Sequence, residues 1–342
     1  MKETLIIKYM DIGERKIPVV SSNLGFKDII GALRVRFSIG RMKYMINPDL
    51  YAVGNPGQDS NVFVSANYKL SFDMLRSNLK NMDAWILVLD TKGINVWCAA
   101  GKGTFGTGEL VNRIRSTELE KIVKHRRVIV PQLGATGVSY YRVMDLSGFS
   151  VTYGHVRAKD IPEFINNNMK TTDQMRLVKF GLIDRITLVP VELVGGSKYL
   201  IFFMAFVYII SGFGKGIYST DNAFQFGSKA VINIFLVYIA GTLASPILLP
   251  WVPGRSFALK GAIMGAVFFL IACALQLTGA DILQLSGWFL VYISVTSFIF
   301  MNFTGATTYT SLSGVKKEMK IAVPLQAGAF ILSMVIGVVN QI

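Results

Sequence analysis

Cysteine is scarce in this chain of 342 residues, which contains only Cys98 and Cys273. Two cysteines in different regions cannot build the disulfide framework of a small secreted protein. They also cannot supply four thiolates for an iron–sulfur or zinc site within the chain. Histidine is equally scarce, with His125 and His155 alone. These absences narrow the metal and nucleophile chemistry that the chain can perform by itself.

Charged residues are scarce in the second part of the chain. After Ser197 there are 8 Lys and Arg and 3 Asp and Glu, against 27 and 18 up to that residue. Apolar residues make up 52% of the whole, and the mean hydropathy is +0.46. The first part is therefore predicted to be soluble and globular and the second to lie in a membrane. The net charge of +14 suits contact with anionic lipid, and we expect no nucleic-acid partner.

Five apolar runs in the second part predict membrane spans, each of which needs about 20 residues. The first run is short, but Lys198 at its edge can extend toward the interface. Pro246 and Pro250 are expected to kink or end the second. The predicted spans are Tyr199–Phe213, Ala230–Trp251, Gly261–Leu277, Ile282–Phe303 and Ile321–Asn340.

Basic residues in the loops predict the orientation of these spans. The second and fourth loops hold five cations, whereas the first holds two and the third none. The positive-inside rule makes the second and fourth loops cytoplasmic, so the N-terminal domain is expected inside and Ile342 outside. The opening residues MKETLIIKYMDIGERK contain no secretory signal. We expect a multi-pass protein of the cytoplasmic (inner) membrane. The cations are Arg255 and Lys260, then Lys316, Lys317 and Lys320, and in the first loop Lys215 and Lys229.

Hydrophobic runs alternate with helix-like segments in the soluble part. Strands are predicted at 61–64, 83–90, 127–130 and 149–153, with helices at 108–126 and 161–165. This alternation is typical of an α/β domain with a largely parallel sheet, in which ligands bind where strands end and loops begin. We predict an α/β domain over residues 1–192 and an all-α domain of five transmembrane helices over 193–342.

The stretch NVWCAAGKGTFGT, residues 95–107, follows a predicted strand and contains Cys98. Asn95 is a good N-cap, so Val96, Trp97 and Cys98 form the first turn of a predicted helix. A thiol there lies near unpaired backbone N–H groups and the positive end of the helix dipole, which favours the thiolate. Small side chains follow, so a flat, wide ligand could lie close to the backbone. These small residues are Ala99, Ala100 and Gly101.

Three other interpretations of this stretch remain open from the residues alone. Gly101 to Gly106 matches the G-x-G-x-x-G pattern of a dinucleotide site, although no acidic residue ends the following strand. Cys98 could be a buried, inert residue at a helix start, or a catalytic thiol paired with His125 or His155. No G-x-x-x-x-G-K-[ST] sequence occurs, which excludes a P-loop.

The stretch resembles the cap-helix motif of the mercury-methylating corrinoid membrane protein family. It is also similar to the corrinoid-binding domain of the large subunit of the corrinoid iron–sulfur protein. Further blocks resemble the same domain, and together they cover roughly residues 47–192. These blocks are NPGQDS at 55–60, SANYKLSFD at 65–73, ILVLDT at 86–91 and PQLGA at 131–135.

The resemblance implies a Rossmann-like corrinoid-binding α/β domain that holds cobalamin or a related cobamide with its own base displaced. Cys98 would be the catalytic residue and the lower axial ligand of the cobalt. The signature D-x-H-x-x-G, typical of corrinoid proteins in which a histidine binds the cobalt, is absent, which agrees with a ligand other than histidine. The other expected cofactor-binding residues are Ser65, Asn67, Asn95, Val96, Trp97, Ala99, Ala100, Gly101, Lys102, Gly103, Thr104, Gly106, Thr107, Gln132, Gly134 and Ala135.

The implied reaction is a corrinoid-dependent transfer of a methyl group to inorganic mercury(II), which forms methylmercury. Because the chain has no cysteines for a cluster of its own, the resemblance implies a small ferredoxin-like reductant with two four-iron clusters. It also implies a folate-linked methyl donor or its methyltransferase. The alternatives are a membrane corrinoid methyl carrier with a different acceptor and a cobamide-binding module without turnover. At Tyr153-Gly154-His155 the chain departs from the family, where a proline is expected in third place.

Overall fold

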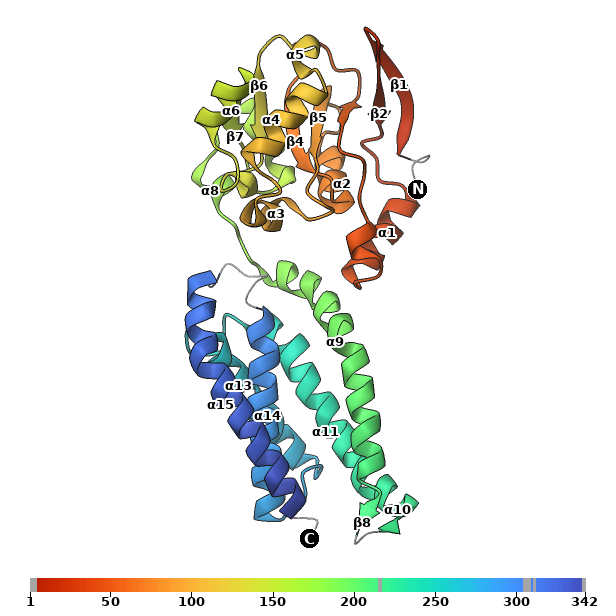
Figure 1. Ribbon diagram of the computed structural model, residues 1–342, viewed down its shortest axis with the longest axis vertical. Coiled ribbons are helices and arrows are strands. Elements are labelled where there is room, and N and C mark those ends of the chain that lie inside the picture. Colours follow the sequence, from red (N-terminus) through yellow and green to blue (C-terminus); the bar gives the residue numbers. More distant parts are fainter. Residues whose placement is uncertain (1–4, 215–216, 304–308, 310–311, 340–342) are drawn as a thin grey trace. The chain divides into compact units, whose positions relative to one another are not determined.

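The computed structural model describes residues 5–214, 217–303, 309 and 312–339, and it divides the chain into two compact units (Figure 1). Unit 1 ends at Val178 and contains the preceding residues except 36–38; unit 2 comprises these three residues and the chain from Lys179 onward. Lys215, Asn340 and Ile342, which entered the predictions of loops and spans, lie outside the described residues. The boundary expected after residue 192 falls inside the first long helix of unit 2, α9 (Leu182–Ile210).

Unit 1 is built on a seven-stranded sheet with the order β1-β2-β3-β5-β4-β6-β7. Strands β5, β4, β6 and β7 run parallel, as predicted, whereas β3 joins β5 antiparallel and β1 forms an antiparallel hairpin with β2. A register shift between Ile6 and Lys8 interrupts the pairing of the edge strand β1. The strands are β1 (Ile6–Ile12), β2 (Arg15–Val20), β3 (Leu50–Val53), β4 (Val62–Ala66), β5 (Ala84–Leu89), β6 (Arg127–Val130) and β7 (Ser150–Tyr153).

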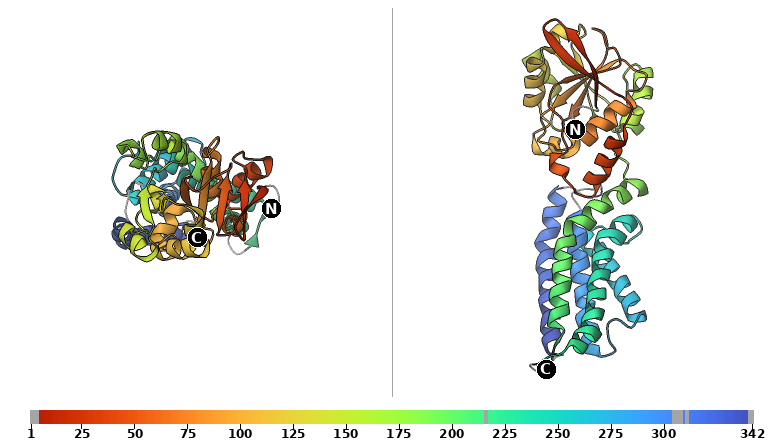
Figure 2. Two further views of the ribbon diagram at one scale, coloured as in Figure 1. Left: turned by 90° about the horizontal axis from the view of Figure 1, so that it is seen from above. Right: turned by 90° about the vertical axis from the view of Figure 1, so that its right-hand side faces the viewer.

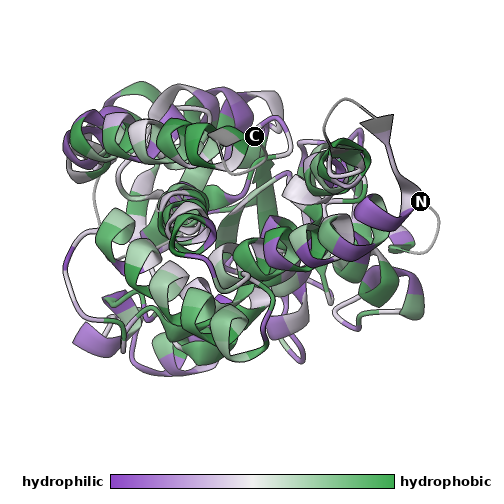
Figure 3. Cartoon of the chain, turned by 90° about the horizontal axis from the view of Figure 1, so that it is seen from below, coloured by the Kyte–Doolittle hydropathy of each residue, from purple (hydrophilic) through white to green (hydrophobic). Residues whose placement is uncertain are grey.

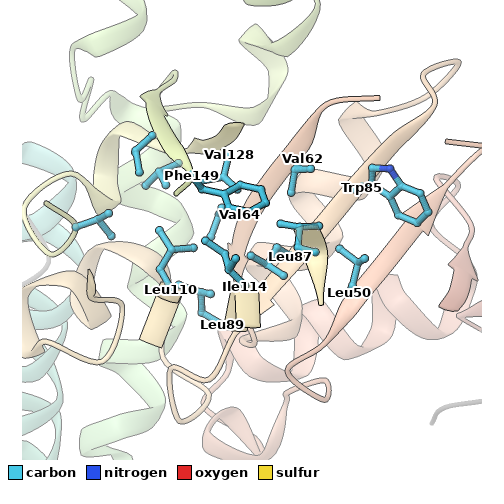
Figure 4. Close-up of a cluster of buried hydrophobic side chains, with 14 of the residues drawn as sticks. Leu50, Val62, Val64, Trp85, Leu87, Leu89, Leu110, Ile114, Val128 and Phe149 are labelled. Carbon is cyan, nitrogen blue, oxygen red and sulfur yellow. The ribbon is translucent and has the colours of Figure 1, made fainter. Parts of the chain in front are cut away.

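Helices cover both faces of this sheet and bury two separate cores. On one face, α3, α4 and α6 pack against side chains such as Val64, Leu87 and Val128 (Figure 4). On the other face, α2 and α7 pack against Phe63, Ile86 and neighbouring residues. Alternate residues of a strand point to opposite faces, so a strand buried on both sides is an unbroken apolar run. The helices are α2 (Lys69–Asn78), α3 (Val96–Lys102), α4 (Thr107–Ser116), α6 (Tyr140–Ser147) and α7 (Ile161–Asn166).

The single helix predicted over 108–126 is wrong in its length. Two helices occupy this stretch, α4 and α5 (Leu119–Ile122). The Thr117 hydroxyl donates to the Arg113 carbonyl at 2.7 Å, and Glu118 then takes a left-handed conformation with φ 49°. That conformation is costly inside a helix, so the chain turns there although the apolar spacing continues. Short elements complete unit 1: η1 (Arg41–Lys43), η2 (Gln132–Gly134), η3 (Ala158–Asp160) and α8 (Asp173–Arg176).

A buried ion cluster fastens α1 (Phe26–Arg36) to α2. Asp28 accepts from the Lys69 Nζ at 2.6 Å and from Arg76 at 2.7 Å, and Asp73 accepts from the same two cations at 2.6 and 2.8 Å. These two cations hold the pKa of Asp28 below its ordinary value despite the opposing effect of burial. Each charge thus has opposite-charge partners, which buried charges require.

Among its described residues, unit 2 contains five helices that are long and apolar enough to cross a membrane, as predicted. Hydrophobic residues dominate them in Figure 3, and the views in Figures 1 and 2 show the long helices running side by side. The first span is longer than expected, because α9 begins at Leu182. The five are α9, Thr220–Leu248, α13 (Phe257–Ala274), α14 (Ile282–Asn302) and α15 (Leu312–Val339, within which Ser313–Val338 is the apolar candidate).

The second span is a composite of several helical pieces. It contains two π-helical stretches, after which Pro246 stands in the first turn of the terminal piece. The hydroxyl of Ser245 donates to the Ala240 carbonyl at 2.6 Å, so a side chain satisfies one carbonyl of the second π-helical stretch. Its pieces are α10 (Thr220–Asn222), η4 (Ala223–Gly227), α11 (Ser228–Ile239), η5 (Ala240–Ala244) and α12 (Ser245–Leu248); a short hairpin, β8 (Phe213–Gly214) and β9 (Ile217–Tyr218), precedes it.

Small residues let α13 and α14 approach closely. A Cβ added at Gly261 would stand 2.7 Å from the Ser297 Cα, and one at Gly265 would stand 2.3 Å from the Tyr292 carbonyl oxygen. Glycines four residues apart are a common means of packing helices in lipid. A buried polar contact joins α14 to α11, where the Tyr292 hydroxyl donates to the Asn233 Oδ1 at 2.8 Å. Cys273, which falls in the predicted span Gly261–Leu277, is the next-to-last residue of α13.

Candidate functional site

The predicted site residues gather at the carboxyl edge of the parallel strands in unit 1. The chain passes from β4 to β5 on one side and then crosses over to β6 on the other side of β4. This reversal creates a switch point between β4 and β6, where open α/β sheets characteristically bind ligands. Ser65 and Asn67 come from the end of β4, and Gln132 follows β6. Helix α3, which carries Cys98, lies in the crossover between β5 and β6.

Helix α3 forms as the sequence predicts, with Asn95 as its cap. The Asn95 Oδ1 accepts from the backbone N–H of Cys98 at 2.9 Å. Val96, Ala99 and Ala100 are buried against the core, whereas Cys98 is exposed. The interpretation of Cys98 as a buried residue is therefore wrong. Trp97 is 39% exposed, so it is only partly packed against the core.

The loop after α3 turns sharply and then inserts an aromatic anchor. Gly103 ends the helix with φ 81°, a conformation that glycine adopts at little cost. The backbone N–H of Phe105 donates to the Ala99 carbonyl at 3.1 Å, and the Phe105 ring is fully buried. Thr104 is half-buried, and its hydroxyl donates to the same Ala99 carbonyl at 3.4 Å. Both hydrogen bonds tie the turn to the end of α3.

Glycines after β6 bring a second loop against α3. A Cβ added at Gly134 would stand 2.4 Å from the Phe105 ring, and one at Gly137 would stand 2.1 Å from the Phe105 carbonyl oxygen. A Cβ added at Gly106 would similarly meet the Gly103 carbonyl oxygen at 2.8 Å. The Thr107 hydroxyl accepts from the backbone N–H of Ser139 at 2.8 Å. Gly106, Thr107 and Gly134, which are among the predicted cofactor-binding residues, thus lie where the loop after α3 and the loop after β6 pack closely together.

Asn67 organises the loop that leads to α3. Its Oδ1 accepts from the Thr91 hydroxyl at 2.8 Å and from the backbone N–H groups of Thr91 and Gly93 at 3.1 and 3.0 Å. Its Nδ2 donates to Asp90 at 3.3 Å, and the side chain is buried. Asn67 therefore positions the α3 loop. Ser65 is also buried, and its hydroxyl donates to the Ala66 carbonyl.

The remaining predicted residues lie on accessible parts of the same edge. Gly101, Lys102 and Gly103 are exposed, and Cβ atoms added at Gly101 or Gly103 would meet nothing within 4 Å. Gln132 and Ala135 are half-buried. The exposed residues of α3 are thus Trp97, Cys98, Gly101 and Lys102, whereas the small residues Ala99 and Ala100 face the core.

The two histidines do not form a pair with Cys98. His125 precedes β6, at the opposite edge of the sheet, where its Nε2 lies 3.0 Å from the Ser60 carbonyl oxygen. His155 follows β7 and is buried, and its Nδ1 has no hydrogen-bond partner among the described residues. Burial lowers the pKa of His155 to about 4. Within the described part of the chain, no three His, Cys, Asp or Glu residues are grouped so as to hold a metal ion.

Three residues that position the loops around α3 were not predicted from the sequence. Thr91 bonds Asn67, Gly137 contacts Phe105, and the Glu109 carboxylate accepts from the backbone N–H of Asp90 at 2.9 Å. Thr91 ends the block ILVLDT, which offered a signal. Gly137 and Glu109 carry no such signal, because their roles depend on which loops become neighbours.

The fold and this edge define a doubly wound α/β domain attached to an apolar helical unit. A sequence model of the family described as CO dehydrogenase/acetyl-CoA synthase delta subunit matches residues 14–165. The match lies within unit 1 and ends before α9.

Particular relatives carry a similar domain. The acetyl-CoA decarbonylase/synthase complex subunit gamma of Methanopyrus kandleri is 33% identical over 123 residues, which are 35% of this chain and 26% of that protein. The same subunit of Archaeoglobus fulgidus is 26% identical over 168 residues, or 48% and 34%. The corrinoid/iron–sulfur protein large subunit of Moorella thermoacetica is 26% identical over 126 residues, or 36% and 28%. The similarity therefore spans about a quarter to a third of each of these relatives.

Proposed function

We propose that unit 1 binds a corrinoid and that the chain is a membrane-anchored, corrinoid-dependent methyltransferase. The proposed reaction passes a methyl group to inorganic mercury(II) and forms methylmercury. The observation that carries this proposal is the exposed Cys98 in the first turn of α3, at the switch point of the sheet. Similarity to a corrinoid/iron–sulfur protein and five apolar helices in the same chain support it.

The residues at this edge fit a large planar cofactor. A Cβ added at Gly101 or Gly103 would meet nothing within 4 Å, so a cofactor could approach the backbone closely at these two positions. Cys98 offers a sulfur atom beside this surface. Thr104, Gln132 and Ala135, which are half-buried on the same edge, would bind the amide groups at the rim of a corrinoid. The cofactor would be cobalamin or a related cobamide with its own base displaced.

Cys98 would be the lower ligand of the cobalt and the residue on which transfer depends. The corrinoid, when bound, supplies a cobalt centre that can carry and release a methyl group. A thiolate is a strong, soft electron donor, and Asn95 and Ala99 fix the backbone from which this one projects. Mercury(II) is a soft cation and suits a methyl group released with its electron pair. Trp97 and Lys102 would border the ring.

The proposed partners are those that the family resemblance implies. The chain has too few cysteines for an iron–sulfur cluster of its own, and the resemblance implies a ferredoxin-like reductant with two four-iron clusters. The methyl group would come from a folate-linked donor or its methyltransferase. The helical unit would hold the domain at the cytoplasmic face of the inner membrane. Relatives that are subunits of a complex support the expectation of protein partners.

The absorption spectrum of anaerobically purified full-length protein tests this function. We expect a bound corrinoid whose spectrum changes in Cys98→Ala, together with loss of methylmercury formation. Cys98→Thr should behave likewise, because a hydroxyl is a poor cobalt ligand. Cys273→Ala is the matched control and should retain both the spectrum and the activity. A protein that takes up no cobalamin, or a Cys98→Ala variant with full activity, contradicts the proposal.

A methyl carrier with a different acceptor is the second candidate. The names of the relatives favour it, because most are subunits of the acetyl-CoA decarbonylase/synthase complex. This candidate predicts the same corrinoid spectrum and the same dependence on Cys98. Membranes assayed with several acceptors distinguish the two, since only a mercury methyltransferase transfers the methyl group to mercury(II) fastest. A cobamide-binding module without turnover would transfer it to none.

A further inference from the structure

Helix α1 presents its apolar stripe to solvent. Phe26, Ile29 and Leu33 are 78%, 56% and 51% exposed, and Ile30 lies beside them at 39%. The spacing of these residues places them on one face of the helix. An amphipathic helix of a soluble domain ordinarily turns such a face toward the core, so this orientation leaves a substantial apolar surface uncovered.

Contacts on the opposite side of α1 fix this orientation. Asp28 is paired with Lys69 and Arg76 of α2 in the buried ion cluster. A Cβ added at Gly31 would stand 2.4 Å from the Tyr44 hydroxyl oxygen, and Val35 is buried beside Tyr44. Residues 28, 31 and 35 share the inner face of the helix, because they are three and seven positions apart. Rotating α1 to bury its apolar stripe would remove Asp28 from the ion cluster.

The apolar surface continues beyond the helix and is bordered by cations. Ile39 and Met42 are 51% and 61% exposed. We call Phe26, Ile29, Ile30, Leu33, Ile39 and Met42 the α1 patch. Five cations lie within residues 26–43, and none forms an ion pair with a described residue. They are Lys27, Arg34, Arg36, Arg41 and Lys43.

We propose that the α1 patch docks on the surface of a bilayer that contains anionic lipid. Exposed Phe, Ile and Leu on one face of a helix, with Lys and Arg beside them, are the features of an interfacial helix. Each cation near an anionic membrane surface adds to the attraction. Only Lys179 to Gly181 separate the end of unit 1 from α9, so the bilayer that holds the helices of unit 2 is always within reach.

The patch adjoins the loop that leads to α3. A Cβ added at Gly93 would stand 3.2 Å from the Met42 carbonyl oxygen and 3.7 Å from the Met45 sulfur. The backbone N–H of Gly93 is in turn held by Asn67. Met42 is thus a direct neighbour of Gly93, which belongs to the segment that positions Cys98. A lipid that contacts Met42 would be separated from this segment by Met42 alone. Docking would fix the orientation of this edge relative to the membrane.

A spin label on the full-length chain tests this proposal. A nitroxide is attached to Leu33→Cys in a chain that also carries Cys98→Ser and Cys273→Ser, in nanodiscs of phosphatidylglycerol and phosphatidylcholine. Oxygen concentrates in lipid and a nickel chelate in water, so the ratio of their collision rates reports the surroundings of the label. Leu270→Cys, 65% exposed on α13, is the lipid standard, and Tyr141→Cys, 77% exposed on α6, is the water standard.

We expect the Leu33 label to resemble the lipid standard in anionic nanodiscs and to shift toward the water standard in phosphatidylcholine alone. Replacing Lys27, Arg34 and Lys43 with Gln should shift the Leu33 label toward the water standard in anionic nanodiscs as well. A label that matches the water standard in both lipids overturns the proposal. Low collision rates with both reagents also overturn it, because they indicate cover by protein. None of these readouts requires a corrinoid, so they are independent of the proposed function.

Discussion

At the scale of single residues, Asn95 connects the sequence motif to the thiol. Its side chain accepts from the backbone N–H of Cys98, within a helix of only seven residues. Such a short helix depends strongly on its cap. Asn95→Ala should cost about 1 kcal/mol, so the amides of residues 98–102 should exchange about fivefold faster with deuterium. Asn95→Asp retains the acceptor and should exchange like the parent; equal exchange in all three chains would contradict this role.

His155 makes the stability of unit 1 depend on pH. Burial lowers its pKa to about 4, whereas an unfolded histidine has a pKa of about 6.5. The unfolded chain therefore binds a proton first as pH falls. The contribution of the neutral His155 ring to the free energy of unfolding is complete above pH 6.5 and declines toward pH 4. Between pH 7 and pH 5 the free energy of unfolding should fall by about 2 kcal/mol.

Thermal unfolding in detergent at several pH values measures this effect. His155→Gln has no proton to gain in this window, so its stability should vary less between pH 7 and pH 5. The ordinary pKa of an aspartate lies below this range, which separates the histidine effect from acid titration of the ion cluster. An unchanged slope in His155→Gln would contradict the prediction.

At the scale of elements, the approach of the loop after β6 to α3 determines the shape of the site. Gly137→Ala would place a methyl group 2.1 Å from the Phe105 carbonyl oxygen and 3.2 Å from the Ala100 Cα. Such overpacking should cost about 1–3 kcal/mol and displace α3. Chemical denaturation and proteolysis near residue 103 measure the two effects. Gly108→Ala in α4 is the matched control, because nothing lies within 4 Å of its added Cβ, and its stability should not fall.

The strands from β4 onward and helix α3 could be predicted from the sequence. Strands buried on both faces are unbroken apolar runs, and Asn95 marks the start of α3. The first elements could not, because α1 turns its apolar residues outward and β2 contains Pro18. The positioning roles of Asn67 and Gly137 also could not be predicted from the sequence, because they arise only when β4 becomes the neighbour of both β5 and β6.

At the scale of the whole molecule, the loop charges predict how unit 2 crosses the membrane. In a chain without other cysteines, Ala280→Cys should react with a membrane-impermeant maleimide in intact spheroplasts. Arg255→Cys should react only after permeabilisation, because its loop is expected in the cytoplasm. Both positions are exposed. The opposite pattern would reverse the orientation and place unit 1 outside.

Lys260, counted among the loop cations, donates to the Leu249 and Val252 carbonyls at 2.8 and 2.7 Å, so it also has a structural role.

The irregular edge strand β1 has a consequence for neighbouring copies of the chain. Proteins confined to a membrane meet one another far more often than proteins in solution, and a regular free strand invites sheet-to-sheet association. The register shift at Ile6 and Lys8, together with the charges of Lys8 and Asp11, makes β1 a poor template for another strand. Crowded copies in one bilayer should therefore not associate with one another through this edge of the sheet.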